Sequence, residues 1–147
     1  MIFTERTAAW ASLVPGLVLS AAIAPKDAWF LPNFLFYMAS QLAVLGVIAA
    51  FRPRPAVAAG SALALAAYLA GYACWVFTRT PAESMAWLGY LFVLPGALLP
   101  IAGAVAWLRG RTGTPAPAAA GLAAVAALAG LGVAQALACS TVMYCGA

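Results

Sequence analysis

The sequence has no histidine and only three acidic residues among its 147. Charged residues make up 7% of the chain, whereas soluble domains carry about 25%. Histidine and paired carboxylates supply most acid–base catalysis and many metal sites, so their scarcity removes the usual basis for both. Phosphate-binding loops, dinucleotide motifs and catalytic triads are also absent. We therefore expect a protein that is not an enzyme and that uses no cofactor.

Positive charge is in small excess and is dispersed along the chain. Seven Lys and Arg residues face three Asp and Glu, which gives a net charge of +4 and a pI near 9.3. A nucleic-acid-binding domain gathers its cations into a basic patch. The dispersed excess argues against a nucleic-acid partner, and we interpret it instead as a signal of membrane topology.

Apolar residues dominate what is present. They make up 67% of the chain, and the mean hydropathy is +1.03. A helix needs about 20 apolar residues to cross a bilayer, whereas a β-barrel would show alternating segments of about 10. Charged and Pro/Gly-rich breaks leave five apolar stretches, at residues 7–24, 29–51, 56–77, 85–108 and 117–139. The sequence predicts an all-α integral membrane protein, a single domain over residues 1–147 formed by a bundle of five transmembrane helices.

The first apolar stretch also has some features of a secretory signal. Ala22, Ile23 and Ala24 resemble a cleavage site after an apolar run. Pro25 would then be the first mature residue, however, and Glu5 offsets the basic charge that a signal carries near its start. We expect a retained first span.

Orientation follows from the positions of Lys and Arg in the short connections. With the N-terminus inside, five arginines lie on the cytoplasmic side: Arg6, Arg52, Arg54, Arg109 and Arg111. Lys26 and Arg79 lie on the other side, and an odd number of spans places the C-terminus outside. The paired arginines could also bind anionic lipid headgroups or a cytoplasmic partner, although topology already explains them. A bias towards Arg, Ala, Gly and Pro is typical of high-GC bacterial genomes, so we expect a bacterial inner (cytoplasmic) membrane.

Small residues and prolines indicate how the helices pack. In lipid, small side chains let helix backbones approach closely. Two stripes have this character, Gly60, Ala64, Ala67 and Gly71 in the third span and Ala126, Gly130, Ala134 and Ala138 in the fifth. We favour packing within the bundle over a homo-oligomer interface. Pro15–Gly16 and Pro95–Gly96 predict kinks in the first and fourth spans.

Nearly all polar side chains within the spans lie in the predicted outer half of the bundle, whereas the inner half is apolar except for Ser12, Ser61 and residues at the interface. No Asp, Glu, Lys or Arg lies within a span. The candidate contact residues are Asn33, Tyr37, Gln41, Tyr68, Tyr72, Tyr90 and Gln135. Asn33, Tyr37 and Gln41 share a helix face because they are four residues apart. A pore or carrier needs polar groups along its whole path. The asymmetry therefore favours an outward-facing pocket or contact surface, with simple hydrogen bonding between helices as the alternative.

Three cysteines lie towards the predicted outer side, where disulfides persist. Cys139 and Cys145 are expected to form a disulfide that closes a small loop. A redox role is weaker because the spacing is not C-x-x-C. Cys74, Cys139, Met143 and Cys145 are weak candidate ligands for Cu(I), and no metal site is favoured.

These features favour a small membrane accessory protein that binds another membrane component, as a subunit, assembly factor or immunity-type protein. Its expected partners are the lipid bilayer and a membrane protein or a second copy of the chain. The alternative function is transport, or outward-facing binding, of a small molecule or soft metal ion.

Overall fold

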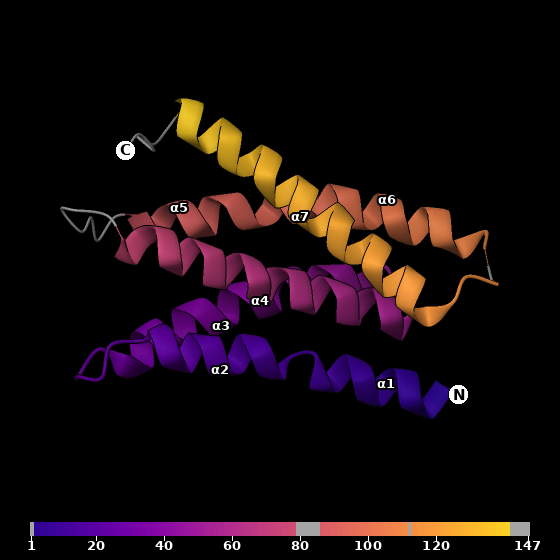
Figure 1. Cartoon of the computed structure of the whole chain (residues 1–147), viewed down its shortest axis with the longest axis horizontal. Helices are drawn as coiled ribbons and strands as arrows, with labels where there is room; N and C mark the ends of the chain where they lie inside the picture. The colour runs from indigo at the N-terminus through magenta and orange to yellow at the C-terminus, as the bar shows by residue number, and fades with distance from the viewer. Residues whose placement is uncertain (1, 79–85, 112, 142–147) are drawn as a thin grey trace.

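The computed structural model describes residues 2–78, 86–111 and 113–141, and in these residues the chain is helical with no strand (Figure 1). Five helical segments are long and apolar enough to cross a membrane: Glu5–Ile23, Phe30–Ala50, Pro55–Phe77, Ala86–Arg109 and Ala116–Thr141. Each begins and ends within two residues of the predicted apolar stretch. The expected all-helical architecture with five long apolar helices is confirmed.

The first segment is broken into α1 (Ile2–Ala11) and α2 (Val14–Ile23). Pro15 has no backbone N–H, so it cannot donate a helical hydrogen bond to the carbonyl of Ala11. The chain turns just before this proline, where the Ser12 hydroxyl donates to the Ala9 carbonyl at 2.7 Å. The expected break is therefore present, and it lies on the N-terminal side of the proline.

The fourth segment is also broken, into α5 (Ala86–Val93), the 3-10 turn η1 (Leu94–Ala97) and α6 (Leu98–Arg109). Pro95 and Gly96 lie within η1, at the predicted kink. A 3-10 turn is tighter than an α-helix, and such turns often mark sites of strain or bending. The break also brings the Gly96 backbone against another helix, as described below.

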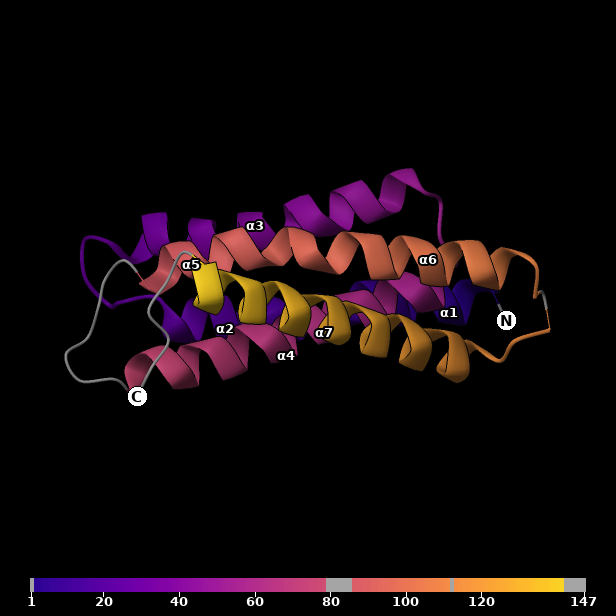
Figure 2. The ribbon, with the colours of Figure 1, turned by 90° about the horizontal axis from the view of Figure 1, so that it is seen from above.

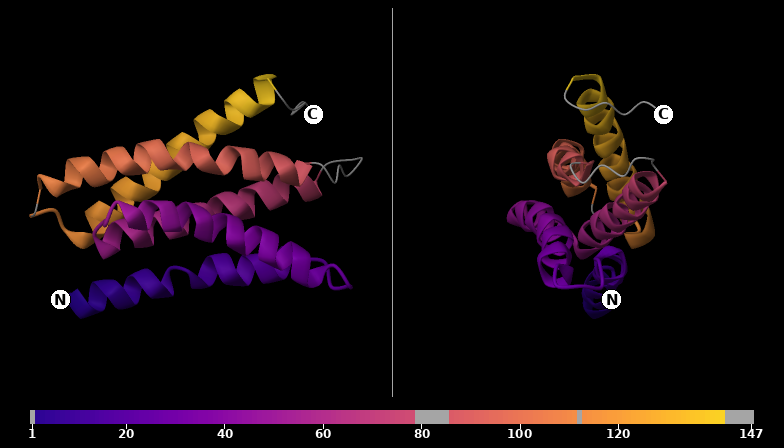
Figure 3. Two further views of the ribbon diagram at one scale, coloured as in Figure 1. Left: turned by 180° about the vertical axis from the view of Figure 1, so that it is seen from behind. Right: turned by 90° about the vertical axis from the view of Figure 1, so that its left-hand side faces the viewer.

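Helix α4 (Pro55–Phe77) is the centre of the bundle and contacts each of the other four segments. Its Leu65 and Leu69 side chains are completely buried. Helix α3 (Phe30–Ala50) runs beside α5 and α6, and α7 (Ala116–Thr141) slants across α4 and η1 (Figures 1 and 2). In the end-on view, the C-terminal part of α7 rises away from the other helices (Figure 3, right).

The contact between α4 and α7 is closest near the N-terminus of each helix. A Cβ atom added at Gly60 would lie 2.0 Å from the carbonyl oxygen of Ala120, so only glycine allows this approach. Farther along α7, a Cβ added at Gly130 would lie 2.3 Å from the carbonyl oxygen of Gly96. Both predicted stripes therefore serve contacts inside the bundle, in agreement with the role of small residues in membrane helices. The buried face of α7 is made by Ala119, Ala123, Ala127, Gly130 and Leu131.

The helices alternate in direction, so the N-terminus and the connections after α3 and α6 lie at one end (Figure 1). We call this the arginine-rich end, because five arginines are in or beside these segments: Arg6, Arg52, Arg54, Arg109 and Arg111. Lys26 is in the connection at the opposite end, and Arg79 is outside the described residues. The charges are therefore segregated along the bundle in the way that the predicted topology requires.

Candidate functional site

Four of the predicted site residues meet in one cluster of rings. Tyr68 and Tyr72, one turn apart on α4, lie 5.9 and 5.5 Å from Tyr90 of α5 between ring centroids. Trp87 of α5 is 4.7 Å from Tyr37 of α3 and 5.8 Å from Tyr72. Ring pairs at these separations stabilise packing beyond their buried area. The aromatic cluster, defined here as these five residues, joins α3, α4 and α5 in the half of the bundle opposite the arginine-rich end.

Two tyrosine hydroxyls of the cluster connect different segments. The Tyr72 hydroxyl donates to the carbonyl of Ala86, in the first turn of α5, at 2.5 Å. A carbonyl oxygen has two lone pairs, so it can accept this bond in addition to a helical one. The Tyr68 hydroxyl donates to Oε1 of Gln135 on α7 at 2.6 Å. The predicted residues Tyr68 and Gln135 thus form a direct polar link between α4 and α7.

 A cleft between α4 and α7 surrounds this link and has a volume of about 470 Å³. This volume is within the range of about 300 to 1,000 Å³ that is usual for small-molecule sites. The residues that line the α4–α7 cleft are Ala67, Tyr68, Gly71, Tyr72, Trp75, Leu128, Gln135 and Cys139. The cleft is therefore mainly apolar and aromatic, with its polar groups gathered around Gln135.

The two glycines of the α4 stripe show why the cleft exists. Gly60 is pressed against the α7 backbone, whereas a Cβ atom added at Gly71 would meet no atom within 4 Å. The two helices touch at Gly60 and diverge towards Gly71, because α7 slants across α4 (Figure 1). Three predicted residues, Tyr68, Tyr72 and Gln135, line the space that this divergence leaves.

The cysteine at the edge of the cleft is oxidised. Cys139 is disulfide-bonded, and its Sγ accepts a hydrogen bond from Nε2 of Gln135 at 3.1 Å. Cys74 is free and exposed on α4. Cys145 and Met143 are outside the described residues, so the predicted pairing of Cys139 with Cys145 stays a prediction. A disulfide sulfur is not a thiolate, so Cys139 in this form is a poor ligand for Cu(I).

Asn33 and Gln41 lie on α3 away from the cleft lining, and both donate to their own helix. Asn33 donates to the Trp29 carbonyl at 2.9 Å, and Gln41 donates to the Tyr37 carbonyl at 3.3 Å. Gln41 is 3% exposed, and a Cβ added at Gly16 of α2 would lie 2.8 Å from its Oε1. Gln41 thus fills the space that Gly16 leaves between α2 and α3.

Tyr90 differs from the other tyrosines in its hydroxyl group. Its side chain is completely buried, and its hydroxyl makes no hydrogen bond of normal geometry. The Ser40 side chain of α3 faces it, but the Ser40 hydroxyl donates to the Tyr37 carbonyl at 2.9 Å. An unsatisfied buried hydroxyl destabilises the fold, so the contribution of Tyr90 comes from its ring.

Trp87 and Trp75 belong to the site although neither was among the predicted contact residues. Trp75 is 5.2 Å from Tyr72 between ring centroids, and it lines the α4–α7 cleft. Each tryptophan is three residues from a site tyrosine on the same helix, and that spacing places two side chains on one face. This spacing is the signal that could have identified them.

Other chemistry is sparse in the described part of the chain. Among residues 2–78, 86–111 and 113–141, no group of three or more His, Cys, Asp or Glu side chains could hold a metal ion.

Comparisons of the chain with protein-family models, with curated proteins and with solved structures each gave no match.

Proposed function

We propose that the chain is a non-enzymatic membrane accessory protein that binds a helix of another membrane protein in the α4–α7 cleft. The observation that carries this proposal is the Tyr68–Gln135 hydrogen bond, which lies in a cleft that stays open between two helices. In lipid, polar side chains favour contact with other protein groups over contact with hydrocarbon. A partner helix in the cleft would cover this polar pair.

The shape of the cleft also supports a helix as the occupant. Its α4 wall includes Ala67 and Gly71, small residues of the kind that let a second backbone approach closely. Gly71 has open space where its side chain would be. The same α4 wall includes Tyr72 and Trp75, residue types that are enriched at protein interfaces.

We place this protein in a bacterial inner membrane, with the arginine-rich end in the cytoplasm. The distribution of Lys and Arg supports this orientation through the positive-inside rule. The cleft then opens in the outer half of the bilayer. A subunit, an assembly factor and an immunity-type protein would each act by such a contact.

Native mass spectrometry of the protein, gently extracted from its own membrane, tests the proposal. We expect a stoichiometric complex with a second membrane protein, and we expect Gly71→Leu to lose the partner because the new side chain fills the cleft. Gly103→Leu is the matched control, since Gly103 on α6 also has open space at its Cβ position. A complex that survives Gly71→Leu as well as it survives Gly103→Leu would overturn the assignment to the cleft.

Binding of a small molecule is the second candidate function, and the cleft volume of about 470 Å³ favours it. The ligand would be largely apolar, with one group that hydrogen-bonds to Gln135. The same mass measurement separates the two functions. A lone protein that carries a small ligand, lost in Gly71→Leu, would favour the second.

A further inference from the structure

A second binding region lies at the arginine-rich end, on the other side of the bundle from the α4–α7 cleft. It consists of two adjoining cavities that share Arg52 and Pro53. The larger, of about 490 Å³, is an apolar groove between the first segment and α3. The smaller, of about 380 Å³, is lined by charged residues at the ends of α1, α4 and α6. Together they form a site with an apolar part and a cationic part.

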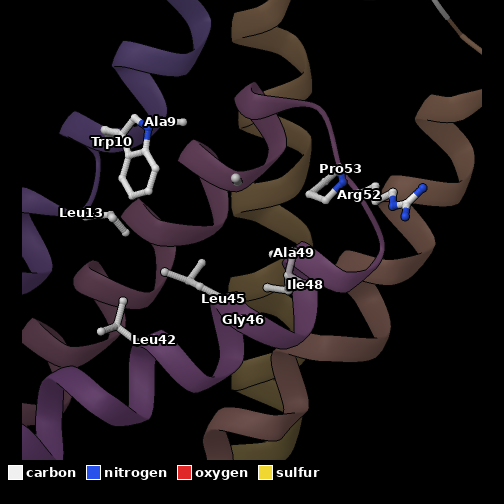
Figure 4. Close-up of a pocket in the computed structure, with 11 residues that line it drawn as sticks. Ala9, Trp10, Leu13, Leu42, Leu45, Gly46, Ile48, Ala49, Arg52 and Pro53 are labelled. Carbon is white, nitrogen blue, oxygen red and sulfur yellow. The ribbon is translucent and has the colours of Figure 1, made fainter.

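Apolar side chains form both walls of the groove. Trp10 and Leu13 come from the first segment, and Leu42 and Leu45 come from α3 (Figure 4). Its floor includes Gly46, where an added Cβ would meet no atom within 4 Å. Trp10 is 74% exposed, and tryptophan in membrane proteins prefers the level of the lipid headgroups. The groove suits a lipid acyl chain that starts near Trp10.

The charged cavity holds more positive than negative charge. Arg52, Arg54 and Arg109 line it together with a single acid, Glu5. Glu5 lies 3.8 Å from Arg54, so these two charges offset each other. Arg109 donates to the neutral carbonyl of Phe51, and its charge has no counterion among residues 2–78, 86–111 and 113–141. An anion in the cavity would supply that counterion.

Arg52 connects the two cavities. Its backbone N–H donates to the Ala49 carbonyl at 2.9 Å, but its side chain makes no hydrogen bond or ion pair in the described part of the chain. Its guanidinium points away from Trp10 (Figure 4). Its φ of 48° is a left-handed conformation that non-glycine residues rarely adopt. Such residues concentrate at ligand sites, where the surrounding structure holds them. Arginine also suits phosphate because its planar fork can donate two parallel hydrogen bonds.

We propose that this site binds an anionic glycerophospholipid, with its phosphate between Arg52 and Arg109 and one acyl chain in the groove. Basic pockets between membrane helices bind anionic headgroups in this way. The proposal requires a bilayer around the bundle but does not depend on which face is cytoplasmic, nor on the partner helix proposed above.

The test is native mass spectrometry of the full chain in mild detergent, titrated with phosphatidylglycerol or with phosphatidylcholine of the same acyl chains. We expect phosphatidylglycerol to bind about tenfold more tightly than phosphatidylcholine, because one hydrogen bond to a charged group contributes about that much. Arg52→Gln is expected to abolish that preference. Arg111→Gln removes the same charge at the same end but is the control, because Arg111 stacks on Trp107 and lines neither cavity.

A second pair of variants tests the groove. Gly46→Leu fills it and is expected to weaken binding of both lipids, whereas Gly103→Leu, at another open position, is expected to leave both unchanged. Equal affinity of wild type and Arg52→Gln for phosphatidylglycerol would overturn the proposal. Displacement of the lipid by soluble glycerol phosphate would also overturn it, because the site would then recognise a free phosphate and not a lipid.

Discussion

Small residues have different roles at the two ends of the contact between α4 and α7. At Gly60 the backbones are so close that a Cβ atom would overlap the Ala120 carbonyl, whereas at Gly71 the space is open. Both glycines belong to one stripe of small residues. The stripe allows close approach, but the slant of α7 decides where the approach occurs. The remaining length of the stripe becomes the wall of a cleft.

The largest effect is expected when the tight end is disrupted. Gly60→Ala places a methyl group against the α7 backbone, which cannot move aside as a flexible side chain can. Overpacking of this kind costs about 1–3 kcal/mol, and we expect the upper part of that range. Thermal unfolding in detergent, followed by circular dichroism, measures the change.

Gly71→Ala is the matched control for that experiment. Its methyl group meets no atom within 4 Å, and alanine favours the helix over glycine by about 1 kcal/mol in soluble hosts. We expect an unchanged or slightly raised unfolding temperature. Equal loss of stability in the two variants would show that the ends do not differ as described.

A smaller effect is expected at the point where α7 crosses η1. Gly130→Ala would direct a methyl group at the Gly96 carbonyl oxygen and at Cγ of Pro100. The 3-10 turn can shift more easily than the regular helix around Ala120, because its hydrogen-bond geometry is poorer. We expect a loss of about 1–2 kcal/mol, less than for Gly60→Ala. The same unfolding assay ranks the two variants, and a larger loss at Gly130 would contradict the ranking.

The sequence predicted the fold well because hydropathy and proline act locally. Charged connections separate the apolar stretches. The missing N–H groups of Pro15 and Pro95 break their helices whatever the packing around them. The seven candidate contact residues were harder to assign. Spacing of four residues placed Tyr68 and Tyr72 on one face, but no local pattern shows that this face meets Gln135, 67 positions away from Tyr68.

Contacts between helices account for what the sequence did not reveal. Gln41 was one of the seven candidates, and its burial against Gly16 depends on the packing of α2 on α3. The lipid site depends likewise on the separation of α1 from α3 and on the backbone conformation of Arg52. Arginines near a membrane interface have a sufficient explanation in topology, so their arrangement around a cavity becomes visible only in three dimensions.

The smallest effect on stability is expected at the open end of the α4–α7 pair, near Gly71. Tyr68→Phe removes the hydroxyl that donates to Gln135 across the cleft, and hydrogen bonds between membrane helices contribute about 0.6 kcal/mol on average. Tyr90→Phe is the matched variant, because its hydroxyl is buried without a hydrogen bond of normal geometry, and we expect it to be neutral or stabilising. Unfolding of both variants in detergent measures the difference. If Tyr90→Phe were the more destabilising of the two, the polar link between α4 and α7 would not be what holds the open end together.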